Sequence, residues 1–391
     1  MDQVDVRGKR VFLRVDFNVP IEGGRVADDT RITAALPTVT HCLDTGARLV
    51  IASHLGRPKG RPDAKHSLGP VAARLSELLG RAVPLAPDCV GPDVEALAGR
   101  LEAGGALLLE NLRFHAEEEA NDDAFARRLA ALGDVYVNDA FAAAHRAHAS
   151  VDAITRHLHP AVAGRLMARE LEALGRIFER PERPVWAILG GAKVSDKLTL
   201  VEHLLERLDG LVVGGGMAFT FLRALGHDVG RSLVEGDRVD AARRVLERAR
   251  GAGKPVRLPV DVVAARDPDD GAGARAVSVR AIPADLMGLD IGPLTVEQFT
   301  LAVKGARTVV WNGPMGVFEK PGFAAGTLGV ARAVAGAGAF AVVGGGDTVA
   351  AVHQAGVAHA MGYVSTAGGA FLEFLEGRTL PGVAALTEAG R

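Results

Sequence analysis

The residues best suited to phosphate chemistry lie near the middle of the chain, where a glycine pair at 190–191 precedes Lys193 and Lys197. An apolar run at 185–189 predicts a buried strand before the glycines, and leucine and valine at helical spacing follow them. The first N–H groups of a helix attract anions, and Ser195 is a candidate to cap this one. The stretch fits either a nucleotide-phosphate site or an ordinary turn with two surface lysines. Taken alone, it does not distinguish between these two interpretations.

An arginine, a histidine or both follow each of four predicted strands in the first half of the chain. These strands are expected at 11–15, 48–52, 106–109 and 135–137, where apolar residues run almost without interruption. The residues that follow them, with one arginine further along, are Asp16, Phe17, Asn18, Arg31, His54, Leu55, Gly56, Arg57, Arg113 and Arg146. Because ligands of parallel α/β domains sit at the carboxyl ends of the strands, we expect these residues to share one edge of a sheet.

This gathering of positive charge indicates an anion site. Any one of these arginines or histidines is more simply explained as a surface residue. Together they would repel one another unless an anion joined them, and arginine suits bidentate contact to phosphate or carboxylate. The first half of the chain therefore predicts a small, multiply anionic substrate, with Asp16 and Asn18 as candidates to select a hydroxyl group on it.

Glycine-rich segments follow the predicted strands of the second half. They include 214–216 and 344–346, and the latter is followed by Asp347 and Thr348. Glycine lets backbone N–H groups approach a ligand, although tight turns explain each segment singly. Asp347 and Thr348 are expected to cap a helix, and Asp347 is a candidate Mg²⁺ ligand. The sequence contains no P-loop pattern, and no dinucleotide-binding fingerprint in its strand-to-helix context.

Bulk properties limit the class of protein. The 391-residue chain is too long for one ordinary core, so two domains are expected. A formal net charge of −2 argues against a nucleic-acid partner or a polybasic membrane binder. Cys42 and Cys89 are not spaced as a metal-binding pair and fit a reduced protein. No signal-peptide pattern opens the chain, and its longest charge-free tract is shorter than the roughly 18 residues that span a bilayer, so we expect a cytoplasmic protein.

Alternating strand and helix patterns predict an α/β fold. Further strands are expected at 185–189, 211–213, 256–258, 308–311 and 340–343, and helical spacing occurs at 36–43, 68–79, 125–132 and 164–174. Near-continuous apolar strands between helices are typical of parallel sheets covered on both faces, which gives three layers. The helix at 164–174 is expected to join two domains, with a last helix of the first domain as the alternative.

Eight stretches, in this order, make the sequence resemble the phosphoglycerate kinase family along nearly its whole length. They are Arg14–Pro20, Ser53–Pro58, Glu110–Phe114, His145–His148, Gly190–Lys197, Gly214–Phe219, Trp311–Pro314 and Gly344–Thr348. One of them would be weak, but the ordered set is highly specific. The resemblance implies two Rossmann-like three-layer domains with mainly parallel sheets, joined by a helix across a cleft. The parts implied are a 3-phosphoglycerate or 1,3-bisphosphoglycerate domain at 1–163, an interdomain helix at 164–180, a Mg-ADP or Mg-ATP domain at 181–375 and a C-terminal tail at 376–391.

The same resemblance implies a reaction and roles for the residues. The reaction is reversible, in-line phosphoryl transfer between 1,3-bisphosphoglycerate plus ADP and 3-phosphoglycerate plus ATP, after the domains close. The ten residues named above for the first half become the substrate residues. The implied nucleotide residues are Lys197, Gly214, Gly288, Glu319, Gly345, Gly346, Asp347 and Thr348, with Glu319 at the ribose and Asp347 at Mg²⁺. Arg31, Lys193 and the amides of Gly345 and Gly346 are implied at the transferring phosphoryl group, and the protein is expected to be a monomer.

Two other functions share part of this pattern. An NAD-dependent dehydrogenase would share the α/β layout but would require the dinucleotide-binding fingerprint. A non-catalytic metabolite-binding protein would have little reason to keep both Arg31 and Lys193. Some positions depart from the family pattern, namely Arg165, Leu286, Leu294 and Ala367. These departures leave the stiffness of the hinge and the adenine contacts open, but not the reaction.

Overall fold

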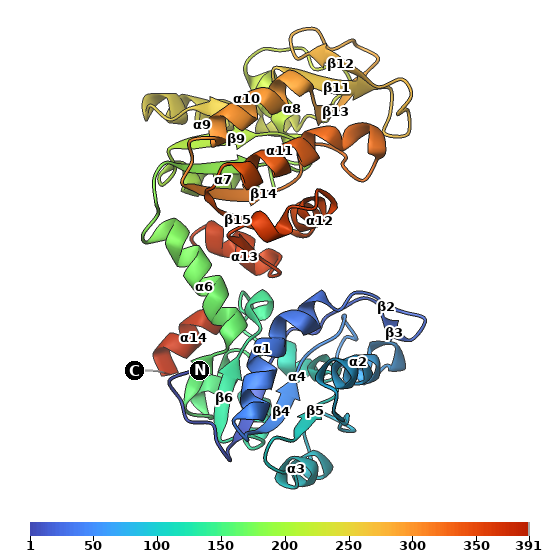
Figure 1. Ribbon diagram of the computed structural model, residues 1–391, viewed down its shortest axis with the longest axis vertical. Helices are drawn as coiled ribbons and strands as arrows, with labels where there is room; N and C mark the ends of the chain where they lie inside the picture. The colour runs from blue at the N-terminus through green and yellow to red at the C-terminus, as the bar shows by residue number, and fades with distance from the viewer. Residues whose placement is uncertain (390–391) are drawn as a thin grey trace. The chain divides into compact units, whose positions relative to one another are not determined.

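The computed structural model describes residues 1–389, in which contacts divide the chain into two compact units. The first unit holds Met1–Leu171 together with the end of the chain from Thr379, and the second holds Glu172–Arg378. Figure 1 labels their helices and strands. Over residues 1–389, no helix combines the length and the apolar character needed to cross a bilayer.

A five-stranded parallel sheet forms the centre of the first unit, in the order β5-β4-β1-β6-β7. Its strands are β1 (Arg10–Arg14), β4 (Arg48–Ala52), β5 (Ala106–Leu108), β6 (Val135–Asn138) and β7 (Ala161–Ala163). Successive residues of β1 point to opposite faces: Val11 and Leu13 belong to one buried cluster, and Phe12 belongs to another. The sheet is therefore buried on both sides, which is why its strands read as continuous apolar runs.

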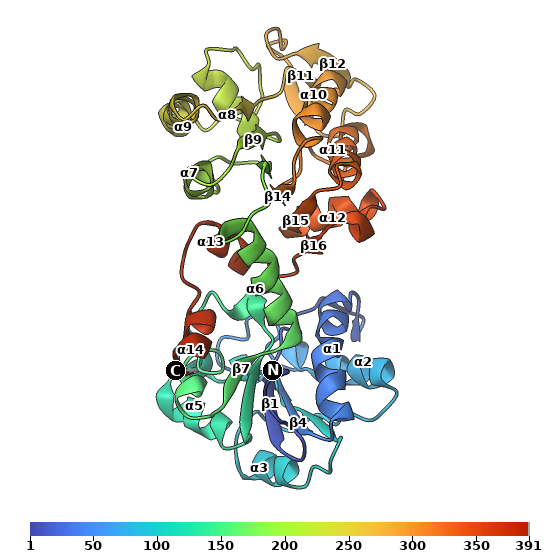
Figure 2. The ribbon, with the colours of Figure 1, turned by 60° about the vertical axis from the view of Figure 1, so that its left-hand side comes forward.

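Helices cover both faces of this sheet. One face carries α1 (Thr30–Asp44) and α2 (Gly69–Leu79), and the other carries α3 (Pro92–Gly99) and α5 (Asp123–Ala130). Figure 2 shows α1 and α2 on one side of β1 and β4, with α5 on the other. The shorter elements of the unit are β2 (Ile21–Glu22), β3 (Arg25–Val26), η1 (Ala64–His66), η2 (Leu112–Phe114), α4 (Ala116–Glu119), η3 (Phe141–Ala143) and η4 (Ala153–Arg156).

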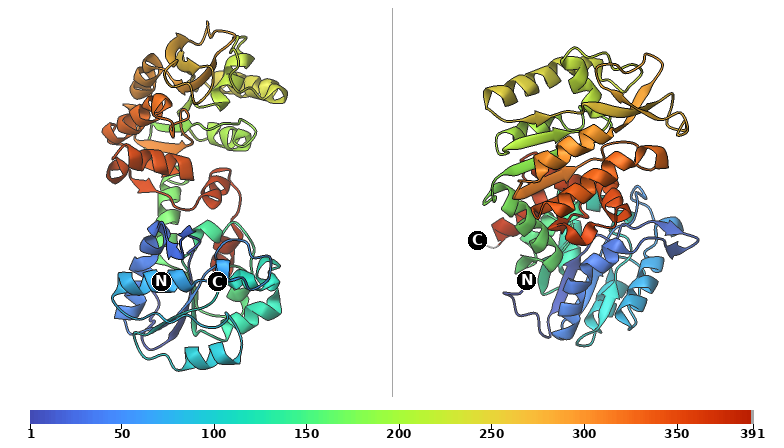
Figure 3. Two further views of the ribbon diagram at one scale, coloured as in Figure 1. Left: turned by 90° about the vertical axis from the view of Figure 1, so that its right-hand side faces the viewer. Right: turned by 45° about the horizontal axis from the view of Figure 1, so that its top comes forward.

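The end of the chain forms a further helix, α14 (Pro381–Ala389), that packs on the first unit. The Gly382 N–H donates to the Ala144 carbonyl at 2.9 Å, and Leu386 contacts the apolar cluster beneath α5. Figure 3 (left) shows this red helix among the elements of the first unit. The prediction for this segment is a C-terminal tail at 376–391, without a helix of its own. A proline in the first turn of a helix lacks only an N–H that would have no partner there anyway, so it starts a helix as readily as it ends one.

Helix α6 (Arg165–Phe178) contains the division between the two units. At its start Arg165 donates to Asp2 at 3.0 Å and contacts the Nδ1 atom of His41 at 2.9 Å. At its end Phe178 packs against Phe374, with ring centroids 5.8 Å apart. The helix predicted from helical spacing at 164–174 is thus present and continues to Phe178, two residues short of the end at 180 that the resemblance implies. The four-part division of the chain stays a prediction.

A six-stranded parallel sheet forms the centre of the second unit, in the order β10-β9-β8-β14-β15-β16. Its strands are β8 (Val185–Leu189), β9 (Gly210–Val213), β10 (Val256–Arg257), β14 (Thr308–Asn312), β15 (Phe340–Gly344) and β16 (Tyr363–Val364). The helices are α7 (Leu198–Leu205), α8 (Met217–Ala224), α9 (Val239–Gly251), α10 (Pro293–Val303), α11 (Ala325–Gly336), α12 (Gly346–Gln354) and α13 (Gly369–Leu375), with η5 (Gly236–Arg238), η6 (Pro321–Phe323) and η7 (Ala358–Ala360). In Figure 2, α7, α8 and α9 lie on one side of β9 and β14, and α10, α11 and α12 on the other.

The second unit also contains a small antiparallel sheet that sequence analysis did not anticipate. It has the order β12-β11-β13 and consists of β11 (Asp261–Ala265), β12 (Arg275–Ser278) and β13 (Met287–Ile291). Apart from this sheet and the β2–β3 hairpin, the expected architecture of parallel sheets between helix layers is confirmed. The carboxyl ends of β1, β4, β5 and β6 meet at one edge of the first sheet, and those of β8, β9, β14 and β15 at one edge of the second. Both edges carry candidate site residues.

Candidate active site

At the end of β1, the loop 16–18 is fixed by hydrogen bonds to its neighbours. The Phe17 N–H donates to Ser53 Oγ at 2.8 Å, and the Asn18 N–H donates to Asp16 Oδ1 at 3.0 Å. Arg31, in the first turn of α1, donates from Nη1 to Asp16 Oδ2 at 2.8 Å. One donor of the guanidinium is thus used to orient it, and the rest of its planar fork is available for an anion.

The loops after β4 and β5 join the same group. The Gly56 N–H donates to Asn18 Oδ1 at 2.9 Å, and Arg113 Nη1 donates to the Gly56 carbonyl at 2.8 Å. Burial lowers the pKa of Arg113, while Glu119, 3.3 Å from its Nε atom, partly opposes that effect. Direct hydrogen bonds among residues 16–18, 56 and 113 therefore link three strand ends. Leu55 is buried beneath the loop.

Two exposed arginines among the predicted substrate residues do not join this network. Arg57 and Arg146 are both exposed, and Arg146 Nε contacts Nε2 of the neighbouring His145 at 3.2 Å. Their side chains are long enough to reach an anion from the rim of the group. Their assignment to the substrate stays a prediction.

Arg14, which is fully buried at the end of β1, is not among the predicted site residues. Its Nε donates to Ser150 Oγ at 2.8 Å, and its Nη2 lies 3.2 Å from His54 Nδ1. Arginine has only donors, so His54 Nδ1 must accept, and the proton of the neutral ring is on Nε2. An arginine inside an apolar strand is almost never buried without partners, and that signal was present in the sequence.

Two buried histidines beside these arginines, His54 and His148, are held neutral. Burial, followed by the charges of Arg14 and Arg113, lowers the pKa of His54 well below its usual range. The same causes, in the same order, lower the pKa of His148 to about 3. The positive charge of the arginines is thus concentrated in a partly buried region, and it disfavours protonation of the two histidines. A multiply charged anion would relieve this repulsion.

The pKa of His148 gives a prediction about stability. The pKa of a histidine in an unfolded chain is about 6.5. Between that pH and about 3, this histidine is therefore protonated in the unfolded chain and neutral in the folded chain. The free energy of unfolding should therefore fall as the pH drops through this window, by about 1.4 kcal/mol per pH unit for this histidine. His148→Gln should flatten the profile by that amount in denaturant unfolding, relative to the parent protein. His159→Gln, at an exposed histidine, is the control. A His148→Gln profile parallel to the parent would contradict the prediction.

In the second unit the glycine segments lie against one another backbone to backbone. The Gly190 N–H donates to the Asn312 carbonyl at 3.0 Å, the Gly191 N–H to the Pro314 carbonyl at 2.9 Å, and the Gly214 N–H to Leu189. A Cβ atom at Gly190 would lie 2.1 Å from the Pro314 carbonyl oxygen. Glycine is required here because three chain segments approach more closely than any side chain permits.

Two capping predictions for this unit are wrong. Helix α7 begins at Leu198, and Ser195 lies outside it, where its hydroxyl donates to Glu235 Oε1 at 2.5 Å. Helix α12 begins at Gly346, so Asp347 and Thr348 lie within its first turn and Gly345 is the cap residue. In both places a hydroxyl side chain hydrogen-bonds to a residue distant in the sequence. Ser195 does so with Glu235, and Thr348 Oγ1 accepts the Gly313 N–H at 2.7 Å.

Lys197 is held at the edge of the sheet. Its Nζ donates to Asn312 Oδ1, and Asn312 Nδ2 donates to the Gly344 carbonyl at 2.7 Å, so the lysine is tied to the ends of β14 and β15. Burial lowers the pKa of Lys197, and the charges of Asp196 and Asp347 oppose that effect. Lys193, four residues earlier, is exposed.

A cavity of about 330 Å³ opens beside these segments. Its polar lining includes Glu319 and Asp347, and the glycines 191, 215, 216 and 288 contribute backbone. The apolar wall, which sequence analysis missed, includes Phe219, Leu233, Pro259, Val262, Met287 and Ile291. A Cβ atom at Gly288 would lie 2.1 Å from the Phe219 ring, so only glycine fits between ring and cavity. An apolar slot of this volume with a few polar groups at its rim is typical of small-molecule sites.

The predicted nucleotide residues fall into two groups. Gly288, Glu319 and Asp347 line the cavity. Lys197, Gly214, Gly345, Gly346 and Thr348 do not line it, but they follow the ends of β8, β9 and β15, with Gly346 and Thr348 in the first turn of α12. The structure thus separates an apolar slot from a neighbouring glycine-rich edge that carries a lysine.

Comparisons with known proteins agree with this arrangement. A sequence model described as phosphoglycerate kinase matches residues 1–378. The chain belongs to the phosphoglycerate kinase family. The phosphoglycerate kinase of Pelotomaculum thermopropionicum is 55% identical over 385 residues, 98% of each chain, and that of Moorella thermoacetica is 56% identical over 388 residues, 99% of this chain and 98% of the relative.

Solved structures agree as well. Phosphoglycerate kinase from Coxiella burnetii has a TM-score of 0.92 at 43% identity, covering 100% of this chain and 99% of its own. The enzyme from Pyrococcus horikoshii has a TM-score of 0.87 at 35% identity, covering 100% and 98%. Members of this family are phosphotransferases with a carboxyl group as acceptor, so the chain is an enzyme of glycolysis. The predicted fold, family and reaction are confirmed.

Proposed function

We propose that the first unit binds 3-phosphoglycerate or 1,3-bisphosphoglycerate and that the second binds ADP or ATP. The observation that carries the proposal is the division of chemistry between the units. One sheet edge gathers Arg31, Arg113 and the neutral His54, and the other adjoins an apolar cavity with glycine amides and Lys197. The first set suits a small anion with several charges. The second suits a base beside a row of phosphates.

Transfer between the two ligands requires no general base. The carboxylate of 3-phosphoglycerate is already ionised at neutral pH and attacks the terminal phosphorus of ATP directly. The phosphorus–oxygen bond to the new acyl phosphate forms as the bond to ADP breaks, so no proton moves. The enzyme has to align the two ligands in line and to stabilise the charge on the moving phosphoryl group. We assign that task to Arg31, Lys193 and the amides of Gly345 and Gly346.

The residues around the cavity also fit a nucleotide-bound Mg²⁺ ion. Mg²⁺ is usually held by one or two carboxylates together with phosphates, and Asp347 presents an exposed carboxylate at the rim. When bound, the ion would neutralise phosphate charge. Glu319, on the same lining, is the proposed ribose contact, and Thr348, in the first turn of α12, remains a proposed nucleotide contact.

The half-sites belong to different units, so we propose that transfer follows a closure that brings the two ligands together and excludes water. Solution scattering should show a smaller radius of gyration when 3-phosphoglycerate and a non-hydrolysable ATP analogue are both present than with either alone. An unchanged radius with both ligands would count against closure.

A coupled assay with Mg-ATP and 3-phosphoglycerate tests the function as a whole. We expect turnover that depends on both substrates, and calorimetry should show ADP binding in preference to NAD. Preferential NAD binding would favour a dehydrogenase, and ligand binding without turnover a metabolite-binding protein. We further propose a cytoplasmic monomer that acts on small molecules, without a nucleic-acid or membrane partner.

A further inference from the structure

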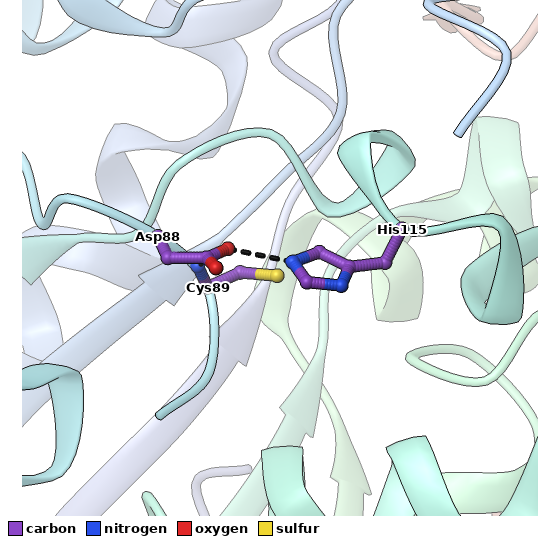
Figure 4. A group of neighbouring side chains, drawn as sticks. All are labelled: Asp88, Cys89 and His115. Carbon is purple, nitrogen blue, oxygen red and sulfur yellow. Dashed lines mark hydrogen bonds and ion pairs between the residues drawn. The ribbon is translucent and has the colours of Figure 1, made fainter. Parts of the chain in front are cut away.

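Three side chains of different ligand types converge in the first unit, apart from the active-site residues. They are Asp88, Cys89 and His115, shown in Figure 4. One potential ligand atom from each lies within 4.8 Å of the others, and Asp88 Oδ1 is 2.7 Å from His115 Nε2. Within residues 1–389 this is the one group of three or more histidine, cysteine or acidic side chains that meets so closely.

The surroundings hold these side chains in place and leave an entry path. The Cys89 N–H donates to Asp88 Oδ1 at 2.6 Å, and the ring of His115 stacks on Phe125 with centroids 5.2 Å apart. Cys89 is fully buried, whereas the side chains of Asp88 and His115 are 43% and 23% exposed. In Figure 4 the sulfur and the carboxylate both face the Nε2 edge of the imidazole. An ion could therefore enter from the carboxylate side and reach the sulfur.

We propose that Asp88, Cys89 and His115 form a binding site for a thiophilic divalent cation of the Zn²⁺ class, with water as the fourth ligand. Thiolate, imidazole and carboxylate are the three ligand types that Zn²⁺ accepts, whereas Mg²⁺ prefers oxygen alone. Zn²⁺ ligands lie about 2.0–2.3 Å from the ion, so tetrahedral partners are roughly 3.3–3.8 Å apart. Carboxylate oxygen and imidazole nitrogen fall at the short end of this range, so the 2.7 Å contact between Asp88 and His115 must open by roughly 0.7 Å, which rotation of the partly exposed carboxylate can supply.

Binding exchanges a proton for the ion. A cysteine binds a metal ion as the thiolate, so a protonated sulfur must lose its proton on binding. The cation displaces the thiol proton to solvent as the sulfur–metal bond forms. The occupied site would tie the segment before α3 to the residue that follows η2, the short helix that carries Arg113. It should thereby stabilise the first unit against unfolding.

Cobalt(II) provides the test, because a thiolate bound to Co²⁺ gives a charge-transfer band that oxygen and nitrogen ligands do not. We expect one equivalent of Co²⁺, added to the full chain without nucleotide, to produce this band, and Zn²⁺ to remove it by competition. Cys89→Ser should abolish the band. Cys42→Ser is the matched control, because Cys42 is the second buried cysteine and lies in α1. Its variant should keep the band unchanged.

His115→Gln gives a second, independent result. Losing a direct ligand should weaken Co²⁺ binding by more than the roughly 10–100-fold that loss of an outer partner costs. Circular dichroism will show whether each variant folds. If Cys89→Ser does not fold, the Co²⁺ affinity of His115→Gln decides the test. Absence of the band in the parent protein, its persistence in Cys89→Ser, or unchanged affinity in His115→Gln would each overturn the proposal. None of these measurements depends on turnover, so the result is separate from the proposed function.

Discussion

Replacement of Arg31 by alanine should lower kcat by about 10³-fold, the lower end of the effect of arginines that act on a transferring phosphoryl group. The guanidinium is already oriented, since its Nη1 donates to Asp16 Oδ2 at 2.8 Å while the side chain remains 33% exposed. Orientation before the ligand arrives reduces the reorganisation that the transition state would otherwise require. Because the charge on the phosphoryl oxygens is greatest in the transition state, kcat should fall more than the affinity for 3-phosphoglycerate.

Further variants distinguish the effect of the Arg31 charge from the effects of its planar geometry and of altered folding. Arg31→Lys keeps the charge but loses the planar fork, and should recover only part of the activity. Arg128→Ala, at an exposed arginine of α5, is the control for removing a surface charge. Unfolding curves will report whether Asp16, left without its ion pair, disturbs the loop after β1. Near-normal kcat with a raised KM for 3-phosphoglycerate would make Arg31 a substrate-binding residue only and remove it from the catalytic group.

The strands and the site edges could be predicted from the sequence because their signals are local. A strand buried on both faces reads as an apolar run, as at 185–189, and the chain must turn directly after it. The polar residues that follow, such as Asp16 and Arg113, are therefore placed at one edge by topology alone. The loop network confirms that Asp16, Asn18, Gly56 and Arg113 meet there.

What the sequence did not reveal depends on partners distant along the chain. The burial of Arg14 requires Ser150, 136 residues away, and Ser195 was drawn from its expected cap by Glu235, 40 residues away. The apolar wall of the cavity was missed for a related reason. Three of its residues, Val262, Met287 and Ile291, belong to β11 and β13, which are separated by β12 in the sequence and come together only by antiparallel pairing. Local pattern determines which residues can do chemistry, and distant pairing determines which ones are held in position.

Replacement of Lys193 by alanine should lower kcat by about 10²–10³-fold, the loss typical of removing one donor aimed at a developing charge. Lys193 lies in the turn after β8, two residues beyond Gly191, whose backbone is fixed to the Pro314 carbonyl at 2.9 Å. The turn is therefore rigid at its base while the lysine itself is exposed. Affinity for 3-phosphoglycerate should remain nearly unchanged, because that ligand is assigned to the other unit.

Two substitutions show whether this lysine acts on the moving phosphoryl group or on the nucleotide. Lys197→Ala removes the neighbouring lysine that is tied to Asn312, and should raise the KM for ATP, since we assign Lys197 to the nucleotide phosphates. Lys304→Ala, at an exposed lysine after α10, should leave both constants unchanged. If Lys193→Ala raised the KM for ATP with little loss of kcat, Lys193 would be a nucleotide contact. A large loss of 3-phosphoglycerate affinity would place it in the substrate site instead. If only kcat fell, Lys193 would contact the moving phosphoryl group in the transition state alone. Arg31 and Lys193, which belong to different units, would then stabilise the same phosphoryl group.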